Sequence, residues 1–235
     1  VICMRHPQSG SVAEFASASR VPVINGGDGS NEHPSQALLD LYTIERELQA
    51  RGRHIDGLRI AMVGDLKYGR TVHSLSKLLT LYRNIRVVLV SPPELAMPEA
   101  YVEAMRTVGH QVEITECLEK SISRVDIVYS TRIQEERFQD RTQADLYRGR
   151  FRLNQAIYTR HCEPNTVIMH PLPRDSRAEA NELDVDLDNN PNLAIFRQTD
   201  NGLIVRMALF ALILDVDRLV DKYAREVPWF NHRNR

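Results

Sequence analysis

Residues 59–74 read Arg-Ile-Ala-Met-Val-Gly-Asp-Leu-Lys-Tyr-Gly-Arg-Thr-Val-His-Ser, and this stretch decides the fold class. Its apolar, β-branched start at 59–64 predicts a buried strand, and the apolar spacing over 71–81 predicts a helix after it. A strand, a tight turn and a helix in this order form the unit of parallel α/β sheets. The turn lacks the G-x-G-x-x-G pattern, which disfavours a nucleotide-binding oxidoreductase. It instead brings Lys67 and Arg70 to the carboxyl end of the strand, where such sheets bind ligands.

The same alternation of strand and helix patterns continues along the chain. It predicts strands at Val1–Met4, Val21–Asn25, Arg59–Gly64, Arg86–Ser91, Gln111–Thr115, Ile127–Ser130, Val167–His170 and Ala194–Phe196. It predicts helices at Ser11–Ser19, Pro34–Ala50, Thr71–Leu81, Pro98–Val108, Leu118–Arg124 and Leu203–Leu219. Strands and helices that alternate in this way favour parallel sheets with right-handed crossovers, so we predict an α/β protein with two doubly wound parallel-sheet domains.

Composition places the chain among globular proteins. It has 235 residues, 43% of them hydrophobic, and a formal net charge of −1, which gives no reason to expect a nucleic acid or a membrane as partner. The three cysteines have no C-x-x-C spacing, so a reducing compartment such as the cytoplasm fits better than a disulfide framework. The longest apolar run, Gly202–Leu214, is too short to span a bilayer and predicts a buried helix.

Two domains are predicted. Residues 37–201 contain a complete βαβ series, and residues 1–36 together with 202–235 form a second, partial domain. The chain opens on Val1-Ile2-Cys3-Met4, a run typical of a core strand. A domain seldom begins inside its own sheet, so we expect this first domain to be incomplete.

Residues 28–36, Asp-Gly-Ser-Asn-Glu-His-Pro-Ser-Gln, lie between a predicted strand and a predicted helix. Pro34 suits the first helical turn, which puts His33 at the positive end of the helix dipole. Gln36 follows three residues later and faces the same way. An imidazole, an amide and free backbone N–H groups at a helix start can bind a carbonyl or phosphate oxygen. An ordinary helix cap with a surface histidine is the alternative interpretation of this motif.

Three further motifs end predicted strands. Arg5 follows the first strand, Arg132 and Gln134 lie two residues apart in an extended segment, and Leu172-Pro173 lie in a loop whose two prolines expose carbonyl oxygens. We expect these side chains to form a site for a small polyanion. No metal-ligand spacing, nucleophile elbow or Walker loop occurs, so the sequence predicts no metal and no cofactor. The residue types favour direct transfer between two anionic ligands, with electrostatic stabilisation.

These segments, in this order, resemble the aspartate carbamoyltransferases up to about Leu214. The matching motifs are Met-Arg-His-Pro at 4–7, His-Pro-Ser-Gln at 33–36, Gly-Asp-Leu-Lys-Tyr-Gly-Arg-Thr-Val-His-Ser at 64–74, Thr-Arg-Ile-Gln at 131–134 and His-Pro-Leu-Pro at 170–173. An ornithine carbamoyltransferase is expected to carry Cys in place of Pro171, which favours aspartate as the acceptor.

The resemblance implies the aspartate/ornithine carbamoyltransferase fold and transfer of a carbamoyl group from carbamoyl phosphate to L-aspartate in pyrimidine synthesis. By this resemblance, Arg5 and His33 are the catalytic residues, and they bind the carbonyl oxygen of carbamoyl phosphate. Carbamoyl phosphate is bound by Arg5, His33, Gln36, Leu172 and Pro173. Aspartate is bound by Arg70, Arg132 and Gln134. The resemblance also implies that the protein forms a homotrimer with active sites shared between subunits. Regulatory chains or dihydroorotase chains are implied as possible partners.

This sequence departs from the family pattern at its start. The Ser-Thr-Arg-Thr segment that holds phosphate, and the loop that a neighbouring subunit lends, do not occur in these residues. We therefore expect weak or no activity from this chain alone. Two alternatives stay open, namely a non-catalytic structural subunit and a carbamoyltransferase for another amino acid.

Overall fold

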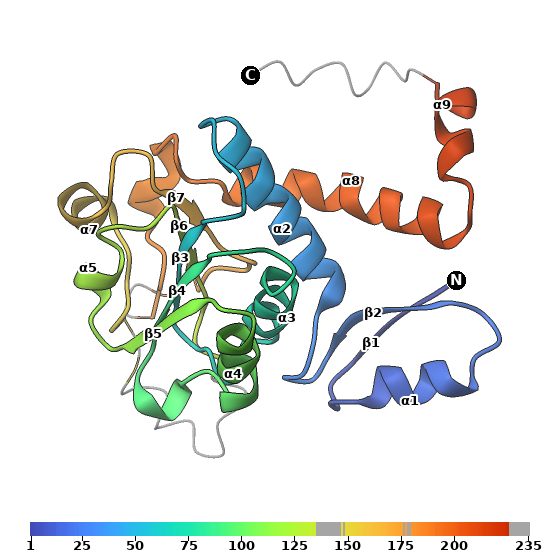
Figure 1. Ribbon diagram of the computed structural model, residues 1–235, viewed down its shortest axis with the longest axis horizontal. Helices are drawn as coiled ribbons and strands as arrows, with labels where there is room; N and C mark the ends of the chain where they lie inside the picture. The colour runs from blue at the N-terminus through green and yellow to red at the C-terminus, as the bar shows by residue number, and fades with distance from the viewer. Residues whose placement is uncertain (135–146, 148, 176, 178–179, 226–235) are drawn as a thin grey trace.

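A five-stranded parallel sheet forms the centre of the computed structural model, which describes residues 1–134, 147, 149–175, 177 and 180–225 (Figure 1). Its strand order is β5-β4-β3-β6-β7. The bounds are Arg59–Val63 for β3, Arg86–Val90 for β4, Gln111–Thr115 for β5, Ile127–Ser130 for β6 and Val167–Met169 for β7. The central strands carry β-branched and aliphatic residues at nearly every position, as strands covered on both faces do. The stretch quoted first therefore supplies the middle strand of this sheet.

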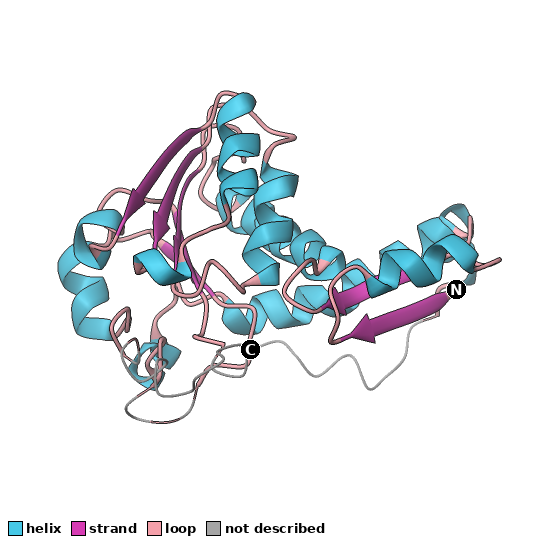
Figure 2. Cartoon of the chain, turned by 90° about the horizontal axis from the view of Figure 1, so that it is seen from below, coloured by secondary structure: helices cyan, strands magenta, loops and turns pink. Residues whose placement is uncertain are grey.

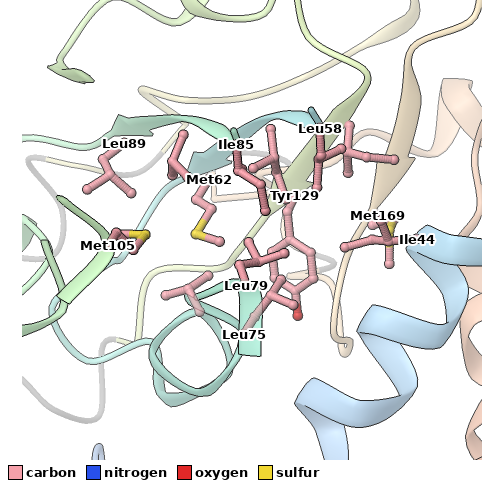
Figure 3. Close-up of a cluster of buried hydrophobic side chains, with 14 of the residues drawn as sticks. Ile44, Leu58, Met62, Leu75, Leu79, Ile85, Leu89, Met105, Tyr129 and Met169 are labelled. Carbon is pink, nitrogen blue, oxygen red and sulfur yellow. The ribbon is translucent and has the colours of Figure 1, made fainter. Parts of the chain in front are cut away.

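Helices cover both faces of the sheet. On one face lie α2 (Pro34–Gln49), α3 (Arg70–Leu79) and α4 (Glu99–Thr107), and on the other lie α5 (Leu118–Ser121) and α7 (Gln155–His161) (Figure 1). Figure 3 shows the larger apolar cluster, in which Leu75 and Leu79 of α3 pack against Met62 and Tyr129 of the sheet. These layers are the predicted α/β architecture.

Two isoleucines with different exposure provide a test of which residues form the core. Ile60 on β3 is completely buried, whereas Ile114 on β5 is 51% exposed. Ile60→Val removes one buried methyl group and is expected to lower the free energy of unfolding by about 0.5–1.5 kcal/mol. Ile114→Val changes it by less than about 0.5 kcal/mol, because water already covers that side chain. Chemical denaturation of both variants checks this, and equal losses would contradict the assigned core.

A smaller unit stands apart from this sheet. Its strands β1 (Ile2–His6) and β2 (Val23–Asp28) form a two-stranded parallel sheet, and α1 (Ser11–Ala18) connects them (Figure 2). The Asp28 carboxylate accepts hydrogen bonds from the Gly10 backbone N–H at 2.7 Å and from the side chains of Asn25 and Asn31 at 2.8 and 2.9 Å. These bonds shape the turn that leads from β2 into α2.

The predictions for the C-terminal region were wrong in two respects. Residues 194–196 do not form a strand, because Ala194 makes only one sheet-like bond, to the Ile168 carbonyl, before α8 (Ile195–Ile213) begins. The helix therefore starts eight residues before the predicted Leu203 and ends before the predicted Leu219. It is also not buried, since Leu203, Met207 and Leu212 are more than half exposed. A three-residue apolar run is too short for its pattern to separate a strand from a helix start.

The other predicted strands and helices are confirmed, with ends that differ by at most three residues. The sequence patterns did not predict α7. In the described part of the chain, no helix is both long and apolar enough to cross a membrane. Residues 226–235 of the predicted first domain lie outside the described residues, and the domain boundaries themselves stay a prediction.

Candidate active site

A cavity of about 270 Å³ lies where the smaller unit meets the carboxyl ends of β3, β6 and β7. The residues to which the sequence analysis gave a catalytic or binding role all line this cavity, namely Arg5, His33, Gln36, Arg70, Arg132, Gln134, Leu172 and Pro173. Lys67, which the sequence also placed at this edge of the sheet, is not among the lining residues. None of the described lining residues is acidic. The arginines therefore give the cavity wall a net positive charge, which favours an anionic ligand.

His33 occupies the N-cap position of α2, with Pro34 as the first helical residue. Its backbone N–H donates to the Ser74 hydroxyl oxygen at 2.9 Å, which fixes the helix start against α3. Burial lowers the pKa of His33 to about 4, and the charges of Arg70, Arg5 and Arg206 act in the same direction. The imidazole is thus neutral at physiological pH and has one N–H to donate.

Asp65 joins the two strand-end segments that carry the arginines. Its carboxylate is fully buried and accepts the backbone N–H of Tyr68 at 2.9 Å and that of Gln134 at 3.2 Å. The Gln134 side-chain amide donates in turn to the Tyr68 carbonyl at 2.6 Å. Burial raises the pKa of Asp65, and these hydrogen bonds oppose that rise. The β3–α3 turn with Arg70 and the segment after β6 with Arg132 are therefore held together.

Gly27 lies directly against the guanidinium of Arg70. A Cβ atom at this position would lie 2.7 Å from Arg70 Cζ, and the φ angle of Gly27 is +116°. The Arg70 side chain also donates to the Gly29 carbonyl at 3.1 Å. The glycine-rich turn after β2 therefore forms the surface on which this guanidinium rests.

Gly27→Ala is expected to displace the Arg70 guanidinium and to raise the KM of the anionic ligand that Arg70 is predicted to bind by about tenfold. Gly109→Ala is the matched control, because Gly109 also has a positive φ, +89°, but no atom within 4 Å of the added Cβ. Both variants are expected to lose about 1–2 kcal/mol of stability through backbone strain. Steady-state kinetics and thermal unfolding separate the two effects. A KM that rises equally in both variants would contradict the role of Gly27.

The loop after β7 brings Leu172 and Pro173 to the cavity wall. The His170 backbone N–H donates to Gln198 Oε1 at 3.0 Å, and the Leu172 N–H donates to His170 Nδ1 at 2.9 Å. Leu172 has a positive φ of 58°, and the Leu172–Pro173 peptide is cis. These contacts hold Leu172 and Pro173 in the cavity wall, as the two-proline pattern predicts.

Arg206 of α8 also lines the cavity, and the sequence analysis did not assign it to the site. A Cβ on Gly202 would lie 2.5 Å from Arg206 Nη1, so the missing side chain at 202 leaves room for the guanidinium to lie along the helix. Arg206 is the one charged residue in the apolar run 202–214, and it lies one helical turn after a glycine. This was the feature of the sequence that could have indicated a role in the site. Arg206 adds a fourth arginine to the cavity wall.

The arrangement suits small anions. Four arginines, the neutral imidazole of His33 and two glutamines surround a space of amino-acid size, and His33 lies at the positive end of the α2 dipole. Among the described residues, no group of three or more His, Cys, Asp or Glu side chains could hold a metal ion. Such a wall can bind two anionic reactants side by side and stabilise charge that develops between them.

Family models define the class of protein. The Asp/Orn binding domain of aspartate/ornithine carbamoyltransferases matches residues 56–213, and the carbamoyl-P binding domain of the same family matches residues 1–46. Both matches fall on the elements that build the cavity.

Individual relatives narrow the class. The chain is 75% identical over 233 residues to an aspartate carbamoyltransferase catalytic subunit of Saccharophagus degradans, covering 99% of this chain and 69% of that protein. It is 74% identical to the corresponding subunit of Cellvibrio japonicus, covering 98% of this chain and 68% of that protein. This chain belongs to the family of aspartate carbamoyltransferase catalytic subunits.

Solved structures agree with this assignment. The aspartate transcarbamoylase of Trypanosoma cruzi in complex with carbamoyl phosphate and aspartate superposes with a TM-score of 0.79 at 38% identity. The match covers 88% of this chain and 65% of the trypanosomal chain. The present chain thus spans about two thirds of the length of the proteins it resembles.

Proposed function

We propose that the protein containing this chain transfers the carbamoyl group of carbamoyl phosphate to the amino group of L-aspartate, giving N-carbamoyl-L-aspartate and phosphate. The convergence of four arginines on one cavity without an acidic lining residue among those described carries the proposal. Aspartate brings two carboxylates and carbamoyl phosphate brings a phosphate, so the two ligands together need several cations. The names of the relatives and the ligands of the trypanosomal structure support this choice of substrates.

In this proposal the carbamoyl phosphate lies on the His33 side of the cavity. Arg5 and the neutral His33 imidazole donate to the carbonyl oxygen, and Gln36 with the Leu172 and Pro173 carbonyls accepts the N–H groups of the carbamoyl nitrogen. Arginine donors and a neutral N–H suit an oxygen that gains negative charge during the reaction.

Aspartate lies on the other side in this proposal. Arg70 and Arg132 each bind a carboxylate through paired N–H groups, a geometry that a guanidinium matches and an ammonium does not. Gln134 supports this side, because its backbone N–H binds Asp65 and its side chain binds the Tyr68 carbonyl. The Asp65 contacts thus set the distance between the two carboxylate sites.

The reaction then needs no covalent enzyme intermediate. The lone pair of the uncharged aspartate amine attacks the carbonyl carbon and forms a C–N bond, and the π electrons of the C=O bond pass to the oxygen held by Arg5 and His33. The tetrahedral intermediate collapses as the C–O bond to phosphate breaks. Phosphate leaves with the bonding electron pair and takes up the one proton that the nitrogen releases. Orientation of both anions and stabilisation of the oxyanion supply the acceleration.

The setting of this activity is part of the proposal. A homotrimer with shared sites, a cytoplasmic location and a place in pyrimidine synthesis follow from the family resemblance. Regulatory chains and dihydroorotase are candidate partners on the same ground. We also propose residues 37–201 as the aspartate-binding domain, with residues 1–36 and 202–235 in the carbamoyl phosphate domain.

The direct test incubates the full-length protein with carbamoyl phosphate and either L-aspartate or L-ornithine. Carbamoyl aspartate and phosphate are expected in equal amounts with aspartate, and no product with ornithine. Product from ornithine alone would move the assignment to another carbamoyltransferase. No product from either acceptor, by protein whose fold and mass are verified, would favour a non-catalytic subunit.

A further inference from the structure

A buried carboxylate lies directly behind Gln36, outside the cavity wall. Asp40 is on α2, one helical turn after Gln36, and is completely buried. Its Oδ1 accepts the side-chain amides of Gln36 at 2.9 Å and Gln198 at 2.6 Å. Its Oδ2 accepts the hydroxyl of Tyr129 at 2.6 Å. One carboxylate therefore joins α2, α8 and β6 behind the site.

The ionised carboxylate of Asp40 fixes the orientation of the side-chain amides of Gln36 and Gln198. An ionised carboxylate only accepts hydrogen bonds, so each glutamine must present its Nε2 to Asp40 and its Oε1 to the opposite side. Gln198 Oε1 accepts the backbone N–H of His170 at 3.0 Å, which holds the loop with Leu172 and Pro173. Gln36 lines the cavity, and no hydrogen bond from the described residues reaches its Oε1.

Asp40 is ionised under working conditions. Burial raises its pKa to about 6, and the hydrogen bonds from Tyr129, Gln198 and Gln36 and the charge of Arg206 limit the rise. The group is thus an anion at neutral pH. An anion without a salt-bridge partner in the interior is costly, and an apolar residue would fill the same space more cheaply. Its three directed hydrogen bonds indicate a positioning role beyond packing.

We propose that Asp40 is a positioning residue that turns Gln36 Oε1 into the cavity and thereby selects a transferred group that carries N–H donors. The inference rests on the proposed function. A carbamoyl group ends in an NH₂ that donates to Gln36 Oε1, whereas an acetyl group ends in a methyl that cannot. The same carboxylate, through Gln198 and the His170 N–H, steadies the loop whose carbonyls accept from that nitrogen.

The test compares the dissociation constants of carbamoyl phosphate and acetyl phosphate, which share their phosphate and carbonyl groups. Wild-type protein is expected to bind carbamoyl phosphate more tightly. Asp40→Asn keeps the shape but removes the charge and introduces N–H donors, so the glutamine amides lose their fixed orientation. We expect the ratio of the two dissociation constants to fall by about fivefold, through weaker carbamoyl phosphate binding.

Two control variants distinguish a loss of glutamine orientation from a general loss of stability. Tyr129→Phe removes the partner of Oδ2, together with the hydroxyl's bond to Thr71, and leaves both glutamines on Oδ1, so the ratio should stay unchanged. Asp126→Asn removes another buried carboxylate, which binds Arg59 at the opposite end of the sheet and touches neither glutamine. It should lower stability and leave the ratio unchanged.

An unchanged ratio in Asp40→Asn, with both ligands weakened alike, would overturn the proposal. If Asp40→Asn does not fold, Gln36→Met tests the same point, because it keeps the length and removes the acceptor. A ratio unaffected in that variant would also overturn the proposal. Failure of the proposed function is distinct, since wild-type protein would then make no carbamoyl aspartate at all.

Discussion

His33→Ala is expected to lower kcat by about 10²–10³-fold, which corresponds to about 2.7–4 kcal/mol of lost transition-state stabilisation. The imidazole lines the cavity at the positive end of α2, where it can donate to an oxygen that becomes negative. Its side chain makes no capping hydrogen bond to the helix, so the substitution should leave α2 intact. Steady-state kinetics together with circular dichroism check both parts.

The protonation state of His33 gives a sharper control. Because its pKa lies at about 4, the imidazole is already neutral through the physiological range. His33→Gln keeps a neutral N–H donor and should recover part of the lost rate. It should also leave the shape of the kcat profile unchanged between about pH 5 and pH 9. If the histidine acted as a cation, the wild-type rate would fall as pH rises through its pKa, and His33→Gln would abolish that dependence.

The sequence could predict the site because parallel strands end on one edge of a sheet. Arg70 and Arg132 are about sixty residues apart in sequence. Arg70 follows β3 and Arg132 follows β6, and these two strands are neighbours in the sheet. Adjacent β3 and β6 therefore bring them to one cavity without any knowledge of loop geometry. Leu172 reaches it by the same rule from β7, whereas Arg5 comes from β1 in the separate two-stranded sheet.

Arg206 escaped this rule because it lies within a helix. Its helix was predicted to be buried. An arginine inside a buried apolar run is not expected to contact a ligand. In the structure α8 exposes Leu203 and Met207, and Arg206 reaches the cavity past Gly202. Periodicity identifies a helix but does not say what covers each of its faces.

The buried carboxylates Asp40 and Asp65 could not be predicted either. Their partners Gln198 and Gln134 are far away in sequence, and the pairing depends on how α8 and the segment after β6 fold back. Residue type alone would place aspartates on the surface. Most residues that line the cavity could thus be predicted from the ends of strands, whereas the buried carboxylates behind them required the tertiary structure.

Arg132→Met is expected to raise the KM for aspartate by about 30- to 1000-fold, equivalent to about 2–4 kcal/mol. The proposed contact pairs this guanidinium with one carboxylate of a dianion, inside a cavity whose described lining residues include no carboxylate. Arg132→Lys should recover little, because an ammonium cannot supply the two parallel N–H groups. The KM for carbamoyl phosphate should change by less than about threefold, since sites without shared partners act independently.

Arg174→Met is the matched control for this prediction. Arg174 follows the Pro173 loop but binds the Asp188 carboxylate at 2.7 Å and does not line the cavity. Its loss should leave the KM for aspartate nearly unchanged. Asparagine as a substitute acceptor tests the charge directly, because it lacks the side-chain carboxylate. If Arg132 binds that carboxylate, Arg132→Met must lower kcat/KM for aspartate far more than for asparagine, and an equal fall for both would remove Arg132 from this role.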